Sequence, residues 1–209
     1  MRRKFAVGMA VVMFITAILV SACTRGAGGQ TEPQGADATV SKPAKPALVV
    51  PESFENEKAK RDFAIVAMAD AYYKEAEKLL NELVTATPEA KTLKQLGSAR
   101  YMLKDYEGAM AAWSKAAELD PALEGEMLNN KANVLRDINK IDEAKETYRQ
   151  AIAADRTLMT AASNLATLLR EEGKLTEAIE VLNQAAVANP KDQIVASMLE
   201  SYKSSLANN

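Results

Sequence analysis

Residues 106–121 read YEGAMAAWSKAAELDP, and the pattern of this stretch returns along the 209-residue chain at intervals close to 34 residues. A period of this length is typical of repeat arrays, in which each unit is one supersecondary element. The four units share a small anchor residue (Ala76, Ala109, Ala144, Ala178), a large residue four positions later (Leu80, Trp113, Tyr148, Leu182) and a small residue twelve positions earlier (Ala64, Gly97, Ala132, Ala166).

Each unit is expected to form two antiparallel helices. Pro88, Pro121 and Pro190 close three of the units, because proline cannot donate a hydrogen bond inside a helix, and Arg156 stands at that place in the other unit. Neither helix of a pair can bury its apolar face alone, so neighbouring units must supply the core. We expect helices at 54–68 with Ser53 as N-cap, 72–85, 89–103, 106–119, 123–138, 141–154, 158–171 and 175–188, with turns at Lys104, Asn139 and Gly173.

This pattern resembles the tetratricopeptide repeat over roughly residues 55–192. The resemblance implies an all-α, right-handed superhelical solenoid of four helix pairs at 53–190. Trp113, Tyr106 and Tyr148 are then expected to fill the core between units rather than stack on a ligand. Residues 191–209 are expected to hold a further helix, from about Asp192 to Leu206, that caps the open end of the stack.

The amino-terminal residues have the pattern of a secretory signal peptide. Three basic residues precede an apolar run at 5–22, and Cys23, the only cysteine of the chain, follows directly. The stretch Val-Ser-Ala-Cys resembles the lipobox of bacterial lipoproteins, which implies removal of residues 1–22 and attachment of lipid to Cys23. The alternative is an uncleaved membrane anchor, since 18 apolar residues reach about the lower limit for spanning a bilayer.

Residues 23–52 are rich in Gly, Ala and Pro and are expected to form a flexible tether between the lipid and the repeats. The apolar residues 48–50 within it are expected to fold back on the first helix. Thr24 follows the cysteine in place of the aspartate that usually retains lipoproteins in the inner membrane. If the organism has two membranes, this resemblance favours the outer membrane, with the repeats facing the periplasm.

Composition argues against several function classes. The chain has 26 basic and 28 acidic residues, and removing residues 1–22 takes away three basic residues and no acid, which leaves a net charge of −5. Nucleic-acid binding is therefore not expected. The chain has no histidine, so a Ser-His or Cys-His nucleophile cannot be built. No phosphate-binding loop or other catalytic motif is present. We expect no enzyme activity, no metal and no cofactor.

The concave surface is the expected binding site, because the first helix of every tetratricopeptide unit lines a groove that receives a peptide or a partner's helix. Asparagine amides there can both donate to and accept from a peptide backbone; the alternative is that they are simply hydrated. The residues that the resemblance places on this surface are Gln95, Ser98, Tyr101, Asn130, Asn133, Arg136, Asn164, Thr167 and Arg170. A carboxylate clamp like that of chaperone-binding members is not expected, because Ser98, Thr160 and Asn164 stand where it needs Asn, Lys and Arg.

Arg136 and Arg170 lie 34 residues apart at the same place in successive units. We expect them to form a cationic step that engages an acidic or carbonyl-rich segment, since guanidinium donors meet carboxylates bidentately. The alternative is pairing with nearby acids (Asp137, Glu171 and Glu172) as weak surface charge.

Two functional interpretations follow. The first is a membrane-anchored adaptor lipoprotein that binds a protein partner, with a layout similar to that of the outer-membrane lipoproteins that assist secretins, pilus machines or envelope assembly. The second is a structural module that self-associates and has no peptide ligand. Homo-oligomers are compatible with either interpretation.

Overall fold

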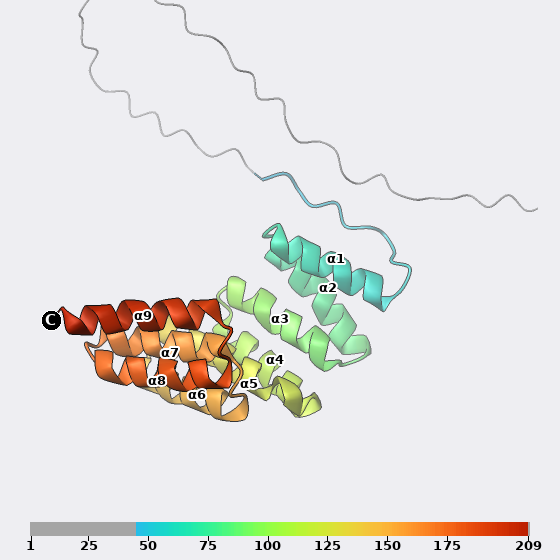
Figure 1. Ribbon diagram of the computed structural model, residues 1–209. Helices are drawn as coiled ribbons and strands as arrows, with labels where there is room; N and C mark the ends of the chain where they lie inside the picture. Colours follow the sequence, from blue (N-terminus) through green and yellow to red (C-terminus); the bar gives the residue numbers. More distant parts are fainter. Residues whose placement is uncertain (1–44, 209) are drawn as a thin grey trace, which may run out of the picture. The chain divides into compact units, whose positions relative to one another are not determined.

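The computed structural model describes residues 45–208, all of whose regular elements are helices (Figure 1). Residues 46–209 form one compact unit with its own core, so we expect this unit to fold by itself. The signal peptide, Cys23 and most of the expected tether lie outside the described residues. Among the described residues, no helix is long and apolar enough to cross a bilayer.

Four helix pairs and a further helix follow one another along the chain. The elements are α1 (Glu57–Ala69), α2 (Tyr73–Ala86), α3 (Ala90–Met102), α4 (Tyr106–Leu119), the 3-10 turn η1 (Pro121–Leu123), α5 (Glu124–Asp137), α6 (Ile141–Ala154), α7 (Met159–Glu171), α8 (Leu175–Ala188) and α9 (Gln193–Ala207). The predicted second helices α4, α6 and α8 are confirmed at both ends. Asp192 is the N-cap of α9 and accepts from the Val195 amide.

The prediction for the start of the first helix was wrong. The helix begins at Glu57 rather than Phe54, because Asn56 and not Ser53 is the N-cap: its side chain accepts a hydrogen bond from the Ala59 amide at 2.8 Å. This leaves Phe54 outside the helix, where its ring packs edge-on against the ring of Phe63, with 5.5 Å between the ring centroids.

The predicted turns are confirmed by backbone geometry. Lys104, Asn139 and Gly173 each follow the first helix of a unit with positive φ, the left-handed conformation that reverses the chain after a helix. The sequence pattern missed the equivalent turn in the first unit, where Ala71 adopts φ 59°. Alanine there has a steric penalty that glycine does not have.

Small residues bring the helix backbones together, as expected. The four anchor alanines and Ala64, Ala132 and Ala166 are fully buried. In the second unit, Gly97 takes this role because the ring of Trp113 lies directly against it. Trp113 is 2% exposed and packs with Met127 and Val134 of the next unit, which confirms its predicted place in the core between units.

The two ends of the stack are covered differently. At the amino-terminal end, Leu48 and Phe54 pack against the first core, and the Tyr72 hydroxyl donates to the Pro46 carbonyl at 2.8 Å. The expected folding back of residues 48–50 is therefore confirmed for Leu48, whereas Val49 is 85% exposed. At the other end, α9 packs on α8, with Tyr202 buried.

Candidate functional site: the concave groove

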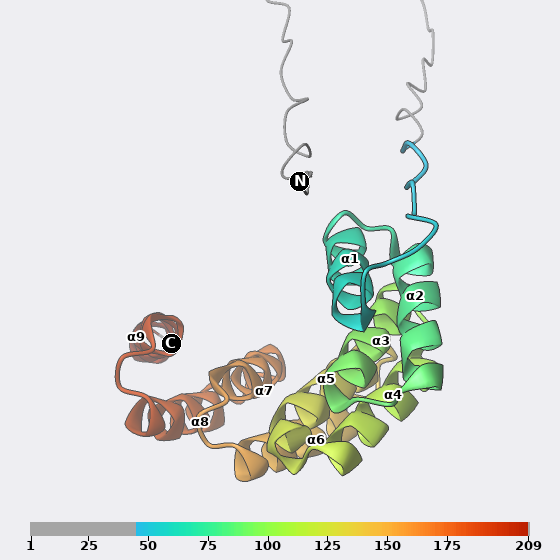
Figure 2. The same ribbon diagram turned by 90° about the vertical axis from the view of Figure 1, so that its right-hand side faces the viewer.

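The helix pairs curve so that α1, α3, α5 and α7 line the inner side of the stack and α2, α4, α6 and α8 its outer side (Figure 2). The predicted site residues all lie on the inner helices α3, α5 and α7. Within each helix they are three positions apart, so they share one face of that helix. Two of them have hydroxyl groups that bond within their own helices: Ser98 donates to the Lys94 carbonyl, and Thr167 donates to the Ser163 carbonyl. Gln95 is half-buried and lines none of the pockets described below.

A cluster of asparagines joins α5 and α7. The Asn164 amide nitrogen donates to Oδ1 of Asn129 at 3.1 Å and to Oδ1 of Asn133 at 3.3 Å. The Tyr148 hydroxyl also donates to Oδ1 of Asn133, at 2.5 Å, and the Asn129 amide donates weakly to Asn130 at 3.4 Å. The structure thus brings together the three predicted asparagines.

Asn129 is a member of this cluster that the sequence analysis missed. It is 7% exposed, and its place in the repeat is held by Lys94 and Ser163 in the neighbouring units. No amide pattern along the repeats therefore marks this position. Its role depends on reaching Asn164 on the next inner helix, a contact 35 residues away in the chain.

Part of the hydrogen-bonding capacity of the cluster is unused. Within residues 45–208, the amide nitrogens of Asn130 and Asn133 and the carbonyl oxygen of Asn164 have no hydrogen-bond partner. An asparagine side chain can make up to four hydrogen bonds. The cluster therefore offers two donors and one acceptor in one place, the combination that a polypeptide backbone satisfies.

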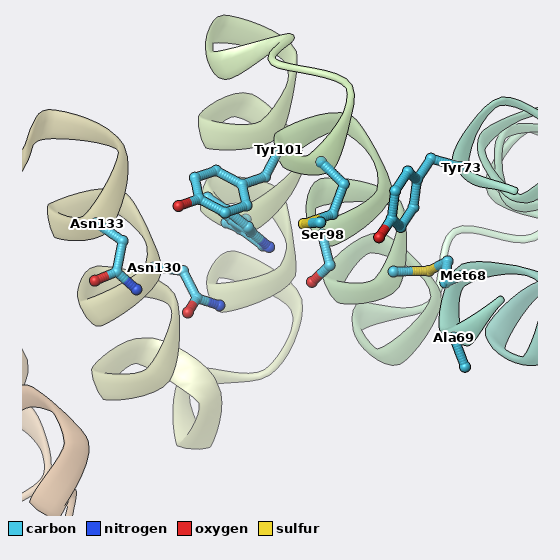
Figure 3. Close-up of a pocket in the computed structure, with 9 residues that line it drawn as sticks. Met68, Ala69, Tyr73, Ser98, Tyr101, Asn130 and Asn133 are labelled. Carbon is cyan, nitrogen blue, oxygen red and sulfur yellow. The ribbon is translucent and has the colours of Figure 1, made fainter. Parts of the chain in front are cut away.

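Two pockets flank Asn130 and Asn133. The first, about 340 Å³, is lined by Met68, Ala69, Tyr73, Ser98, Tyr101, Met102, Trp113, Asn130 and Asn133. Figure 3 shows Met68 and Tyr73 on one side of this pocket and the two asparagines on the other. The second pocket, about 580 Å³, is lined by Glu126, Asn129, Asn130, Asn133, Leu158, Met159, Thr160, Ser163, Asn164, Asp192 and Ile194. The asparagines thus stand between a pocket lined largely by methionine and aromatic side chains and one whose other lining residues include several polar side chains.

Tyr101 forms the wall of the first pocket. Its ring packs against Tyr106 and Trp113, with centroids 5.9 and 6.0 Å away, and its hydroxyl donates to Asp137 Oδ2 at 2.5 Å. Burial, and then this hydrogen bond, raise the pKa of Tyr101 to about 12. The phenol is therefore neutral at physiological pH and is held in place by α5.

Comparison with known proteins agrees with this architecture. Residues 129–193 match the family model of the tetratricopeptide repeat. These residues, which run from α5 to the start of α9, thus contain tetratricopeptide repeats. The fold of the chain is similar to that of TTC0263, a tetratricopeptide protein from Thermus thermophilus, with a TM-score of 0.59, 21% identity, and coverage of 71% of this chain and 81% of that one. It is also similar to the crystal structure of MamA, with a TM-score of 0.56, 20% identity, and coverage of 65% and 80%.

A sequence relative is Protein O-mannosyl-transferase TMTC1 of Mus musculus, 33% identical over 96 residues. The matching segment covers 44% of this chain and spans only a tenth of the mouse protein. The similarity is thus confined to a segment of that protein and brings no activity to this chain. Within residues 45–208, no group of three or more His, Cys, Asp or Glu side chains could hold a metal ion.

The two predicted arginines, Arg136 and Arg170, have different surroundings. Arg136 Nη2 lies 3.4 Å from Asp137 Oδ1, as the surface-pair alternative expects, although the other oxygen of this carboxylate is taken by Tyr101. Arg170 pairs with no acid among the described residues: its guanidinium lies over the Tyr202 ring of α9, 5.0 Å from the centroid. The pairing of Arg170 with Glu171 or Glu172 is therefore not found, and a cation–π contact to the capping helix takes its place.

Proposed function

We propose that this protein is a lipid-anchored adaptor whose concave groove holds an extended segment of a partner protein in the bacterial cell envelope. The observation that carries the proposal is the asparagine cluster with its unused donors and unused acceptor. An extended chain carries alternating carbonyl and amide groups, and it would satisfy both kinds at once. Tetratricopeptide arrays are repeat scaffolds with an extended concave binding surface of this kind.

The two pockets give the groove room for side chains on either side of that backbone contact. Met68, Tyr73 and Met102 offer an apolar and aromatic surface in the first pocket. In the second, Ile194 of α9 is 69% exposed. An exposed isoleucine in a polar pocket is an apolar contact point for a partner. The backbone contacts would provide affinity and the two pockets selectivity.

Arg136 is the cationic residue of the groove that we expect to contact the partner. Apart from the 3.4 Å contact to Asp137, its guanidinium donors have no partner within the described residues, and its side chain is 39% exposed. It lies one helical turn beyond Asn133, so an acidic or carbonyl group could meet both residues. Arg170 is bound to the capping helix, so we assign it a supporting role at the edge of the groove.

The membrane anchor rests on the sequence alone: the basic start, the apolar run and the lone Cys23. More than one acyl chain would give firm attachment, whereas a single chain is marginal. An outer-membrane adaptor that assists a pilus, a secretion machine or envelope assembly is the setting that this layout favours. The test is the intact mass of the purified full chain beside that of Cys23→Ala. Membrane attachment and apparent size that are unchanged in the variant would support an uncleaved anchor instead.

The groove is tested with the unit 46–209 and a displayed library of random peptides. Selected peptides are expected to bind in extended form, and Asn130→Ala is expected to weaken their binding by about tenfold, a loss of one or two hydrogen bonds. Asn183→Ala, an exposed asparagine of the outer helix α8, is the matched control and should leave the affinity unchanged.

The cationic residue is tested in the same assay. Arg136→Ala is the cleaner probe, because the double variant with Arg170→Ala also removes the contact to Tyr202 and weakens the cap. Circular dichroism establishes that each variant is folded. If the variants Arg136→Ala and Asn130→Ala both fold and bind selected peptides as the wild type does, the concave site proposed above is wrong.

A further inference from the structure

A further groove lies between α6 and α8, two of the helices on the outer side of the stack (Figure 2). Its volume is about 830 Å³, larger than either pocket of the concave groove. It is lined by Arg149, Ile152, Ala153, Arg156, Ala162, Leu165, Leu169, Glu177, Glu180, Val181, Gln184, Ala185, Val187 and Ala188. We call it the outer groove.

The floor of the outer groove is apolar. Leu165 and Leu169 of α7 form its base and are almost fully buried, so the apolar area open to a partner comes from the walls, where Ile152 and Val181 are half-buried. Val187 stands at its edge with 82% of its surface exposed. A partner that covers such a surface gains about 25 cal/mol of binding free energy for each Å² of apolar area removed from water.

The two sides of the outer groove carry opposite charges. Arg149 and Arg156 line it from the α6 side, and Glu177 and Glu180 line it from α8. Arg156 and both glutamates make no ion pair within residues 45–208, and Arg149 has only a 3.7 Å contact to an acid, Glu146. These four charged side chains therefore flank an apolar floor and are largely without an oppositely charged partner within the unit.

We propose that the outer groove is the interface of a homodimer, with the same groove of a second copy as its occupant. In an interface with two-fold symmetry, each residue that contacts a second residue is itself contacted by that residue of the partner. A two-fold axis that runs between the two sides of the groove exchanges them. The arginines of each copy then face the glutamates of the other, and the apolar side chains of the groove walls meet between them.

The two-fold axis gives two sets of contacts between arginines and glutamates, one on each side of the interface. A partner of one charge sign would match one side of the groove and be repelled by the other. Since exposed ion pairs contribute little free energy, Ile152, Val181 and Val187 supply most of the affinity, and the charges set the orientation. The dimer leaves both concave grooves open, so it would present two peptide-binding sites.

Sedimentation of the unit 46–209 over a range of concentrations tests the proposal. A reversible monomer–dimer equilibrium is expected. Val187→Glu should raise the dissociation constant on the order of a hundredfold, because it replaces the most exposed apolar side chain of the interface by a charge. The matched control is Val66→Glu, which changes a 58% exposed valine of α1 outside this groove and should leave the equilibrium unchanged.

Charge exchange gives the sharper test. A variant with Arg149→Glu and Arg156→Glu should lose self-association, and so should a variant with Glu177→Arg and Glu180→Arg. A mixture of the two should form a dimer with one copy of each, because every contact is then again between opposite charges. Circular dichroism verifies that each variant is folded.

Two results would overturn the proposal. One is a unit that sediments as a monomer at every concentration that remains soluble. The other is a dimer that none of the groove variants weakens, which would place the interface on another face. Either result leaves the concave adaptor site standing, because the peptide assay does not depend on the dimer.

Discussion

Replacing Gly97 by alanine is a stringent test of how the second unit packs. A Cβ atom at this position would lie 2.4, 2.5 and 2.8 Å from Nε1, Cδ1 and Cε2 of Trp113. Carbon atoms in good contact are about 3.5–4.0 Å apart, so the ring would have to move by about 1 Å. It has no free space to do so, because it is 2% exposed and its Nε1 donates to the Lys94 carbonyl at 3.2 Å.

Two opposing terms set the size of the effect. Overpacking of a core costs about 1–3 kcal/mol, and contact with three ring atoms places this case near 3. Alanine in a helix interior is favoured over glycine by about 1 kcal/mol. We therefore expect Gly97→Ala to lower the free energy of unfolding by about 2 kcal/mol, and the melting temperature by about 4–8 °C for a unit of this size.

The sign of the effect should reverse when the ring is removed. The first and fourth units combine alanine with leucine at the two equivalent places, as in Ala64 with Leu80. Trp113→Leu alone should destabilise by less than the ~3–5 kcal/mol expected for truncation to alanine. In its background, Gly97→Ala should become neutral or stabilising, because the clash is gone and the gain in helix propensity remains.

Thermal unfolding of the four proteins of this cycle, followed by circular dichroism, measures the coupling. We expect a coupling free energy of about 3 kcal/mol, at the upper end of the values for residues in contact. Additive effects, or a melting temperature that Gly97→Ala leaves unchanged, would mean that the ring does not lie against α3 as described.

Three further predictions concern other positions. Ala71→Gly should raise the free energy of unfolding by about 1 kcal/mol, because residue 71 has φ 59°; an unchanged melting temperature would contradict this. Burial raises the pKa of Tyr148 to about 12, against about 10 when unfolded, so the stability that the neutral phenol contributes is present below pH 10 and is lost as the pH rises toward 12. Tyr148→Phe should flatten that alkaline loss in melts between pH 8 and 12. Hydrogen bonds from Lys145 and Lys174 hold the pKa of Glu172 below its usual range, so its contribution is present above the unfolded pKa and lost as the pH falls through the folded one. Glu172→Gln should therefore lower the melting temperature at neutral pH, whereas Glu171→Gln, at an exposed carboxylate without an ion pair among the described residues, should not.

The helices could be predicted closely because local chemistry sets their ends. The outer helices α4, α6 and α8 begin and end where periodicity and punctuation placed them. The start of α1 was misplaced because two residues that can act as N-cap, Ser53 and Asn56, stand three positions apart. Only the structure shows which side chain reaches a free amide.

The candidate site could be predicted only in part, because its energetics depend on contacts between units. The repeat spacing was enough to place Asn130, Asn133 and Asn164 on one surface. It did not reveal the buried Asn129, whose partner lies on the next inner helix. The position of Arg170 depends on how α9 packs, since the Tyr202 ring approaches it from outside the repeat pattern.

The coverage of both ends of the stack has a consequence for how such a chain can evolve. Leu48 and Phe54 close one end, and α9 closes the other with a largely polar outer face that includes Ser197, Glu200 and Ser204. A duplicated 34-residue unit appended beyond either cover would find, among residues 45–208, only scattered exposed apolar side chains such as Val49 and Leu206 on which to pack. A unit inserted between two existing ones would find the surfaces that its neighbours already offer each other. Lengthening of this array by gene duplication is therefore expected to proceed from the middle.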